Sequence, residues 1–278
     1  MGNLRAAILG CGYVGQAVAT LWRQQGLTVT ATTTRPERLE ALRRVADRAL
    51  VVRGDDGAAV ANLLAGQQVL LICVGAGRQA NYEATYLNTA KTVVNALAQA
   101  PDLQQIIFTS TYSVYGNYGG AWAREDSPAQ PATDNGKMML ETEQVLLSAA
   151  TAQRRVCVFR LGGIYGPGRE LAKIYGRSAG TTRPGTGEEA SNWIHLEDIV
   201  GAIDWAQSHH LNGLYNLVQD EIPTVRDLID RVCQAHHLAP VQWDPTQPSA
   251  RPYNVRVSNQ KLKAAGYTFH QPGFSELG

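Results

Sequence analysis

The segment GCGYVG, which begins at Gly10, constrains the fold of this 278-residue chain more than any other. It lies between an apolar run, LRAAILG, and an amphipathic stretch, VGQAVATLWRQQG. In that setting Gly10 permits a tight turn, Gly12 lets a pyrophosphate approach the backbone, and Gly15 lets a helix pack closely on a strand. The free N–H groups of the helix then face the phosphates. The motif therefore predicts a dinucleotide site formed by the three glycines and the intervening Tyr13 and Val14.

Apolar runs and helical patterns alternate along the first part of the chain. Strands are predicted at 4–10, 27–34, 49–55, 67–77, 104–110 and 154–163, and helices at 14–26, 36–46, 81–100 and 137–150. This alternation is typical of a doubly wound parallel sheet with helices on both faces. We therefore predict an α/β fold with a Rossmann-type domain over residues 1–165, whose sheet pattern returns at about 192–218.

The composition changes after residue 165. Residues 176–192 are rich in Gly, Ser, Thr and Pro, which predicts a loop, and a helix is predicted at 224–237 among proline-punctuated segments. We expect residues 166–278 to form mostly a smaller, discontinuous C-terminal lobe that binds the substrate.

The end of the second predicted strand indicates which dinucleotide is bound. NAD-binding proteins usually place Asp or Glu there for the ribose 2′-hydroxyl. This chain has Thr33 at that point, followed by Arg35 and Arg38. Because a guanidinium binds a 2′-phosphate bidentately, we predict NADP(H), with NAD as the alternative, although a solvated helix face would also explain the arginines. Asp55 and its neighbour Asp56 are candidates for the adenine contact or for capping the next helix, and we assign Asp55 to the cofactor.

Charge and cysteine usage exclude several function classes. A net charge of +1 gives no electrostatic footprint for nucleic acid or a membrane surface. No apolar run approaches the ~20 residues that span a bilayer. The four cysteines form no CxxC pair, which favours a reducing cytoplasm over disulfides or zinc, and we expect no metal site. We therefore expect a cytoplasmic protein with a small-molecule substrate, and homodimer formation stays open.

Six segments agree in order and spacing: GCGYVG, YLNTAKTVVNAL, FTSTYSVYG, FRLGGIYGPGR, NWIHLEDIVGAI and GLYNLV. Together they resemble the extended short-chain dehydrogenase/reductases of the NAD-dependent epimerase/dehydratase family. The resemblance implies a seven-stranded parallel core, a cofactor over the carboxyl ends of the strands, and a substrate lobe after Gly166. It also implies that Thr111 is the catalytic hydroxyl and that Lys137 binds the nicotinamide ribose.

The Tyr-x-x-x-Lys pair that this resemblance implies is absent. Aligning on Lys137 puts Thr133 at the tyrosine position, whereas aligning on ETEQVLL puts Asn135 and Met139 at the two positions. None of these side chains replaces a phenol, and general acid–base assistance typically contributes about 10²–10⁴ in rate.

A replacement proton donor has to come from elsewhere. Tyr112, Tyr115 and Tyr118 lie beside the hydroxyl-bearing strand. Tyr115 belongs to the VYG turn, where a structural role is expected, so we predict Tyr118 as the catalytic donor. Asp134 is another acid nearby, but helix capping explains it equally well.

A second departure concerns the substrate. Relatives that act on nucleotide sugars tend to carry Asn before the YG turn, where it meets the diphosphate, and here that position is Gly163. The arginines that remain as candidates for an anionic substrate are scattered: Arg169, Arg183, Arg251 and Arg256. We therefore predict an atypical NADP(H)-dependent oxidoreductase with a degraded dyad, acting on an unidentified small molecule. The alternatives are a nucleotide-sugar epimerase or dehydratase with a displaced acid, and a non-catalytic NADP(H)-sensing regulatory protein.

Overall fold

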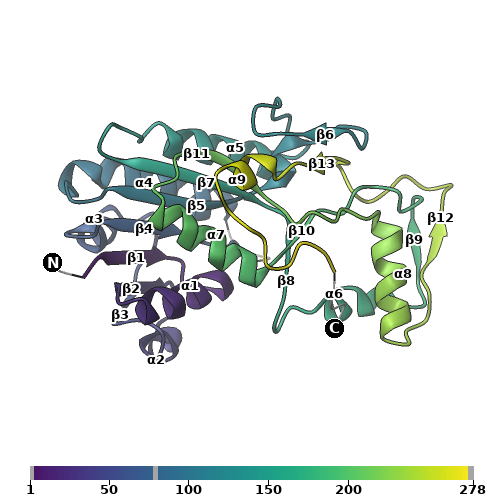
Figure 1. Ribbon diagram of the computed structural model, residues 1–278, viewed down its shortest axis with the longest axis horizontal. Helices are drawn as coiled ribbons and strands as arrows, with labels where there is room; N and C mark the ends of the chain where they lie inside the picture. The colour runs from purple at the N-terminus through teal and green to yellow at the C-terminus, as the bar shows by residue number, and fades with distance from the viewer. Residues whose placement is uncertain (1–2, 78–80, 275–278) are drawn as a thin grey trace. The chain divides into compact units, whose positions relative to one another are not determined.

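The computed structural model describes residues 3–77 and 81–274, and a seven-stranded sheet dominates it (Figure 1). The strands follow the order β11-β7-β5-β4-β1-β2-β3. Their bounds are β1 Arg5–Leu9, β2 Thr28–Thr33, β3 Arg48–Val51, β4 Val69–Ile72, β5 Gln105–Thr111, β7 Arg155–Leu161 and β11 Gly213–Leu217. The pairings β1–β2, β2–β3, β1–β4 and β4–β5 are parallel. The predicted α/β class and the seven-stranded parallel core are confirmed.

The strand order reverses at β1, which places the glycine loop at a switch point. After β1 the chain adds β2 and β3 on one side, then returns to add β4 and β5 on the other. Leu9 pairs with Ile72, so the segments that follow β1 and β4 leave the sheet side by side. Ligands of open α/β sheets bind where the strand order reverses in this way.

The chain divides into two compact units, each built from several segments. Unit 1 comprises Met1–Ser110, Lys137–Phe159 and Val200–Leu214. Unit 2 comprises Thr111–Gly136, Arg160–Ile199 and Tyr215–Gly278. The division passes through β5, β7 and β11, whose last residues count with unit 2.

Helices of unit 1 form where apolar residues recur at helical spacing. Gly15, Val18, Ala19 and Trp22 form the buried face of α1 (Tyr13–Gln24), with spacings of three and four residues. The other helical elements that lie wholly or mostly in this unit are η1 Pro36–Arg38, α2 Leu39–Arg43, α3 Gly57–Leu64, η2 Glu83–Leu87, α4 Asn88–Ala96, η3 Leu97–Gln99, α5 Asp134–Leu147 and α7 Leu196–Ser208. The side chains of β4 are all buried, as expected of a central parallel strand.

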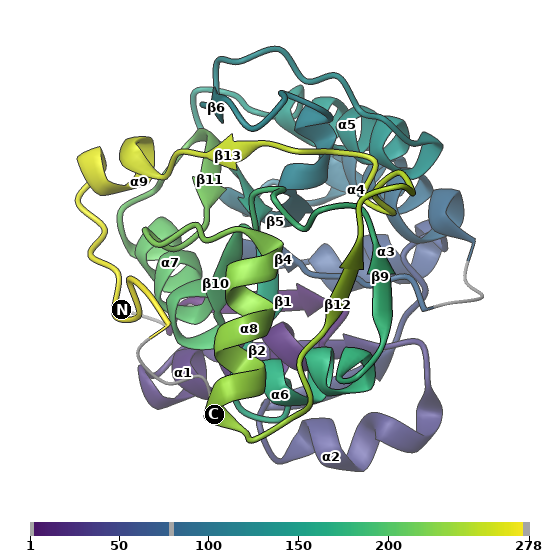
Figure 2. The ribbon, with the colours of Figure 1, turned by 90° about the vertical axis from the view of Figure 1, so that its right-hand side faces the viewer.

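Unit 2 contains three short parallel ladders and its own apolar core. β10 (Trp193–His195) pairs with β8 (Gly163–Tyr165), β12 (Gln242–Asp244) with β9 (Thr182–Pro184), and β13 (Arg256–Val257) with β6 (Trp122–Ala123). Its helical elements are η4 Tyr112–Tyr115, α6 Leu171–Tyr175, η5 Gly176–Ser178, α8 Val225–Ala235 and α9 Gln260–Ala264. Helix α8 lies beside β9 and β12 (Figure 2). It begins with a capping box between Thr224 and Asp227.

The prediction of a continuous loop over residues 176–192 is wrong. The predicted loop at 176–192 contains η5 and β9, because residues 242–244 supply a pairing partner that local composition does not reveal. Within the range 192–218, where the sheet pattern was predicted to return, β11 joins the seven-stranded sheet, whereas β10 pairs with β8 in a separate ladder. The predicted helix at 81–100 is helical throughout residues 82–99, although it changes type along its length: η2 is π-helical, α4 is α-helical and η3 is 3₁₀-helical.

The third predicted strand carries an exposed apolar residue. β3 is the edge strand of the sheet, and its Val51 is 45% exposed. An edge strand has a neighbour on one side only, so its apolar residues are covered incompletely.

Candidate cofactor and substrate site

The three glycines of the loop after β1 have three different surroundings. Gly10 has a φ of +87°, and a Cβ there would lie 2.6 Å from the Cα of Val74. A Cβ at Gly15 would lie 3.0 Å from Cys73 Sγ and 3.1 Å from Ile8 Cγ2. At Gly12 the nearest atom would be the carbonyl oxygen of Gly10, 3.9 Å away, so one side of the loop is open. A tight turn, close helix–strand packing and an open approach are what a pyrophosphate loop needs, so these residues fit a dinucleotide.

Hydrogen bonds from β2 fix this loop. The Gly10 N–H donates to Thr32 Oγ1 at 3.1 Å, and that hydroxyl donates to the Ile8 carbonyl at 3.0 Å. The Cys11 N–H donates to the Thr32 carbonyl at 2.8 Å. Sequence reasoning missed Thr32, because a threonine inside a β-strand gives no sign that its hydroxyl is used.

Cys11 contributes packing to the loop. Its side chain is 2% exposed, and burial raises the pKa of the thiol to about 12, although the charge of Arg38 opposes the rise. A thiol that stays protonated at neutral pH is a poor nucleophile, so a redox role is disfavoured.

Arg35, two residues after the end of β2, exposes its guanidinium group to solvent. Thr33 is buried, and its Oγ1 accepts a hydrogen bond from the Arg35 N–H at 3.1 Å. The Arg35 side chain is 62% exposed, and its one ion pair among the described residues is with Glu37, with Nε 3.9 Å from Oε1. An exposed pair at that distance contributes little, so Arg35 can exchange it for a phosphate.

The two aspartates after β3 have separate partners. Asp56 caps α3 by accepting the Ala59 N–H at 3.0 Å. Asp55 accepts two hydrogen bonds from Arg53, at 3.1 and 2.9 Å. Hydrogen bonding to Arg53 is the main cause that lowers the pKa of the Asp55 carboxyl. The adenine contact assigned to Asp55 stays a prediction.

In unit 2, two hydroxyl groups lie together at the end of β5. Thr111 is the last residue of β5 and precedes η4. Its Oγ1 accepts the Ser113 N–H at 3.3 Å and lies 3.1 Å from Ser113 Oγ. Both side chains are half-buried, so Thr111 can offer its hydroxyl proton to a ligand oxygen.

Helix α5, most of which lies in unit 1, carries Asn135, Lys137 and Met139, which align with positions of the missing dyad. Their side chains differ in exposure. Lys137 is exposed, whereas Met139 and Glu143, four residues apart, are 3% and 1% exposed. The Glu143 carboxylate accepts the Ser110 hydroxyl at 2.5 Å. Asn135 is exposed. The assignment of Lys137 to the ribose stays a prediction.

The comparison with known proteins identifies the family. The protein-family model described as "NAD dependent epimerase/dehydratase family" matches residues 6–217. The chain belongs to this family. A curated relative, Protein YeeZ of Escherichia coli (strain K12), is 30% identical over 248 residues, which cover 86% of each chain.

Solved structures resemble the whole chain. A functionally unknown conserved protein from Silicibacter pomeroyi DSS is 25% identical with a TM-score of 0.80, covering 98% of this chain and 95% of the other. The UDP-glucose 4-epimerase of Thermus thermophilus, solved in complex with NAD, is 20% identical with a TM-score of 0.77, covering 95% and 94%. At this identity the second likeness establishes the fold alone.

The tyrosines of this epimerase/dehydratase family member have distinct partners in unit 2. Tyr115 is fully buried, and its hydroxyl donates to Asn216 Oδ1 at 2.8 Å. The Tyr118 hydroxyl donates to the Pro128 carbonyl at 2.5 Å. The Tyr112 hydroxyl accepts from Arg251 Nη2 at 3.3 Å. Tyr115 therefore acts in the structure as expected, and the catalytic role of Tyr118 stays a prediction.

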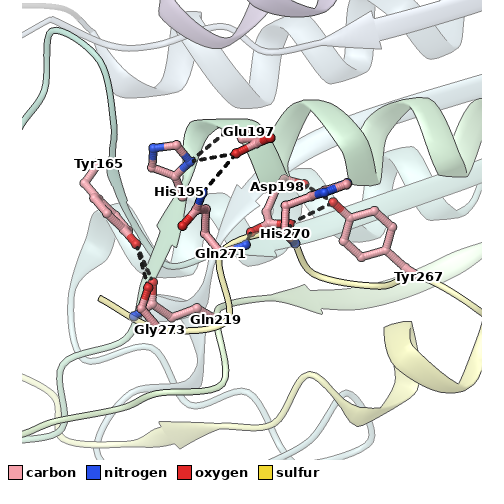
Figure 3. A network of polar contacts seen from close by, with 9 residues as sticks. All are labelled: Tyr165, His195, Glu197, Asp198, Gln219, Tyr267, His270, Gln271 and Gly273. Atoms are coloured by element: carbon pink, nitrogen blue, oxygen red, sulfur yellow. Dashed lines mark hydrogen bonds and ion pairs between the residues drawn. The ribbon is translucent and has the colours of Figure 1, made fainter. Parts of the chain in front are cut away.

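His195, on the strand that precedes α7, belongs to a polar network in unit 2 (Figure 3). Its Nδ1 accepts the Glu197 N–H at 3.3 Å, and its ring packs edge-on against Tyr165. The fully buried carboxylate of Asp198 accepts the Tyr267 hydroxyl at 3.0 Å and the backbone N–H groups of His270 and Gln271 at 2.7 and 2.8 Å. These contacts fasten the chain's last described segment to the first turn of α7, whose residues up to Ile199 count with unit 2.

The position of Gly163 has no space for a side chain. Gly163 pairs with Trp193, and a Cβ there would lie 2.8 Å from Trp193 Cε3. The indole therefore fills the space that a longer residue would need.

The residues that the structure describes contain neither a membrane-spanning helix nor a cluster of metal ligands. No helix there is long and apolar enough to cross a membrane. No three His, Cys, Asp or Glu side chains in those ranges converge as metal ligands would.

Proposed function

We propose that this family member is an NADP(H)-dependent oxidoreductase that acts on a small molecule without the usual Tyr-x-x-x-Lys dyad. The observation that carries the proposal is the open side of the glycine loop at Gly12, between a packed Gly10 and a packed Gly15. The N-terminus of α1 follows directly, and no side chain caps it. Backbone N–H groups in this arrangement bind a pyrophosphate.

The preference for NADP(H) is supported by two arginines. The Arg35 side chain is exposed, and among the described residues its ion pair is the weak one with Glu37; Arg38 follows three residues later at the end of η1. No acidic side chain follows at Thr33 or Thr34, where a ribose 2′-hydroxyl would need one. A guanidinium fork matches the geometry of a phosphate.

The chemistry divides between the cofactor and the protein. The bound nicotinamide supplies or accepts a hydride at a substrate carbon. Thr111 donates a hydrogen bond to the oxygen on that carbon, and Lys137 holds the ribose. In the reducing direction Tyr118 gives its phenolic proton to the same oxygen, and in the oxidising direction it takes that proton back.

The test compares Arg35→Ala with Arg43→Ala, which removes an exposed charge from α2 of the same unit. Losing charge-assisted hydrogen bonds to the 2′-phosphate should weaken NADPH binding about 10- to 100-fold. NADH binding should hardly change, and Arg43→Ala should change neither. Fluorescence titrations measure all four affinities. Equal losses for NADPH and NADH in Arg35→Ala would overturn the assignment.

A second function is favoured by the residues of α5. Asn135 and Met139 offer neither a phenol nor an ammonium, as expected if the protein only senses NADP(H) and controls a partner. If the protein catalyses the reduction of any carbonyl compound by NADPH, it is an enzyme and not only a sensor. A nucleotide-sugar epimerase is less well supported, because the Trp193 indole occupies the space that an asparagine side chain would need at the position of Gly163.

A further inference from the structure

The segment that follows β4 lies against the glycine loop within unit 1. Leu9 pairs with Ile72 at the ends of β1 and β4. One residue later, Cys73 Sγ donates a hydrogen bond to the Gly10 carbonyl at 3.2 Å. A Cβ at Gly10 would lie 2.6 Å from the Val74 Cα, so Val74 also borders the loop. A side chain held by the residues just after Val74 is therefore placed beside the glycine loop.

The phenol of Tyr86 is held at this place. The N–H of Ala76, two residues after Val74, donates to the Tyr86 hydroxyl oxygen at 3.2 Å. Tyr86 belongs to η2, which is π-helical, and single π-helical turns are frequent at functional sites. Both Ala76 and Tyr86 are half-buried. The turn of η2 therefore folds back onto the segment that borders the loop.

Tyr82 packs against Tyr86 from one turn earlier. The two ring centres are 4.6 Å apart and the ring planes are inclined by 46°. Burial raises the pKa of Tyr82 to about 12, and the charge of Tyr86 and a hydrogen bond between the two phenols add to the rise. A hydrogen bond that raises the pKa of a phenol is one that its protonated form donates. Tyr82 therefore donates to the Tyr86 oxygen.

The proton of the Tyr86 hydroxyl is unused. The Tyr86 oxygen accepts from the Ala76 N–H and from the Tyr82 hydroxyl, which satisfies it as an acceptor. Within 3–77 and 81–274, no oxygen or nitrogen accepts the Tyr86 proton in return. Phenols that are withdrawn from water usually have a hydrogen-bond partner. An oxygen of a ligand beside the glycine loop is the partner that this donor lacks.

The order of the strands indicates which part of a dinucleotide Tyr86 meets. Strands β4, β1 and β2 are parallel neighbours, so their carboxyl ends share one edge of the sheet. In the proposed function the 2′-phosphate lies at Arg35 after β2, and the pyrophosphate lies at Gly12 after β1. A cofactor that continues across this edge reaches the end of β4 with its other half, which carries the nicotinamide ribose. The acceptors of that half are phosphate and ribose oxygens.

We propose that the Tyr86 hydroxyl donates a hydrogen bond to a phosphate or ribose oxygen of the cofactor's nicotinamide half, and that Tyr82 positions Tyr86 for this contact. The inference rests on the proposed function, because it needs a dinucleotide in the glycine loop. It adds a contact that NADPH and NADH share, whereas Arg35 recognises only NADPH.

The test titrates the full-length chain by calorimetry with three ligands of increasing length. 2′,5′-ADP carries the adenosine half, 2′-phospho-ADP-ribose adds the second phosphate and ribose, and NADPH adds the nicotinamide. Tyr86→Phe should weaken the binding of 2′-phospho-ADP-ribose and NADPH about 5- to 30-fold and leave 2′,5′-ADP unchanged, because the lost contact lies beyond the adenosine half. Tyr82→Phe should show the same pattern with a smaller loss.

Thr85→Val provides the matched control. The Thr85 hydroxyl belongs to the same helical turn, but it donates within the turn to the Asn81 carbonyl at 2.8 Å. The substitution should therefore change none of the three affinities. A second series with AMP, ADP-ribose and NADH repeats the comparison without the 2′-phosphate, so an error in the assignment of Arg35 does not affect the result.

Three results would overturn the inference alone. Unchanged binding of 2′-phospho-ADP-ribose in Tyr86→Phe would exclude the contact. Equal losses for 2′,5′-ADP and 2′-phospho-ADP-ribose would show that the phenol only holds Ala76 against the loop, and a loss confined to NADPH would move the contact to the nicotinamide ring. If Tyr86→Phe fails to fold by circular dichroism, Tyr82→Phe decides by the same comparison. Wild-type protein that binds no ligand of either series would overturn the proposed function as well.

Discussion

Replacing Gly10 by alanine perturbs the glycine loop in a way that the structure quantifies. The backbone there has a φ of +87°, which costs an L-residue roughly 1–2 kcal/mol. The new Cβ would lie 2.6 Å from the Cα of Val74, a backbone atom that cannot rotate away. Overpacking of this kind costs about 1–3 kcal/mol. Together the two effects predict a loss of about 2–5 kcal/mol in the free energy of unfolding.

Gly26 provides a matched control, because its φ is +89° and a Cβ there meets no atom within 4 Å. Gly26→Ala carries the backbone strain without the clash, so its cost should be about 1–2 kcal/mol. Urea unfolding of the cofactor-free proteins, followed by circular dichroism, measures both free energies without a contribution from ligand binding. A Gly10→Ala variant no less stable than Gly26→Ala would refute this reasoning.

Two further substitutions test the polar network and the proton donor. Asp198→Ala leaves the Tyr267 hydroxyl and two backbone N–H groups without their acceptor, and should cost roughly 2–5 kcal/mol in urea unfolding; a cost below about 1 kcal/mol would show that the network in Figure 3 stabilises little. Tyr118→Phe should reduce the NADPH-dependent turnover of any carbonyl substrate by about 10²–10⁴ and leave NADPH affinity unchanged, since only the proton donor is removed. Full activity in that variant would exclude Tyr118.

The features predicted correctly are those that local sequence encodes. The glycine loop, β1, α1 and β2 are consecutive, so spacing and periodicity alone define them. Ladders of two or three residues, such as β9 with β12, depend on a partner far along the chain, and glycine-rich composition conceals them. Composition indicates a loop at β9 for that reason.

Contacts between segments that are distant in the sequence are the least predictable property. Arg183 and Arg251 are scattered in sequence, where each looks like a solvated residue. Their segments nevertheless meet where the backbones of Gly185 and Ser249 approach closely, and this contact has no sequence signature. The use of Thr32 to hold the glycine loop is hidden in the same way.

The central claim is that the loop around Gly12 binds NADP(H), and a fluorescence titration of the wild-type chain and of Gly12→Ala with NADPH tests it most directly. We predict saturable wild-type binding in the micromolar range, with NADH weaker. We also predict a large loss of affinity in Gly12→Ala at nearly unchanged stability, because the added methyl group points to the open side of the loop. Absence of NADPH binding, or equal affinity in the two proteins, would contradict the claim.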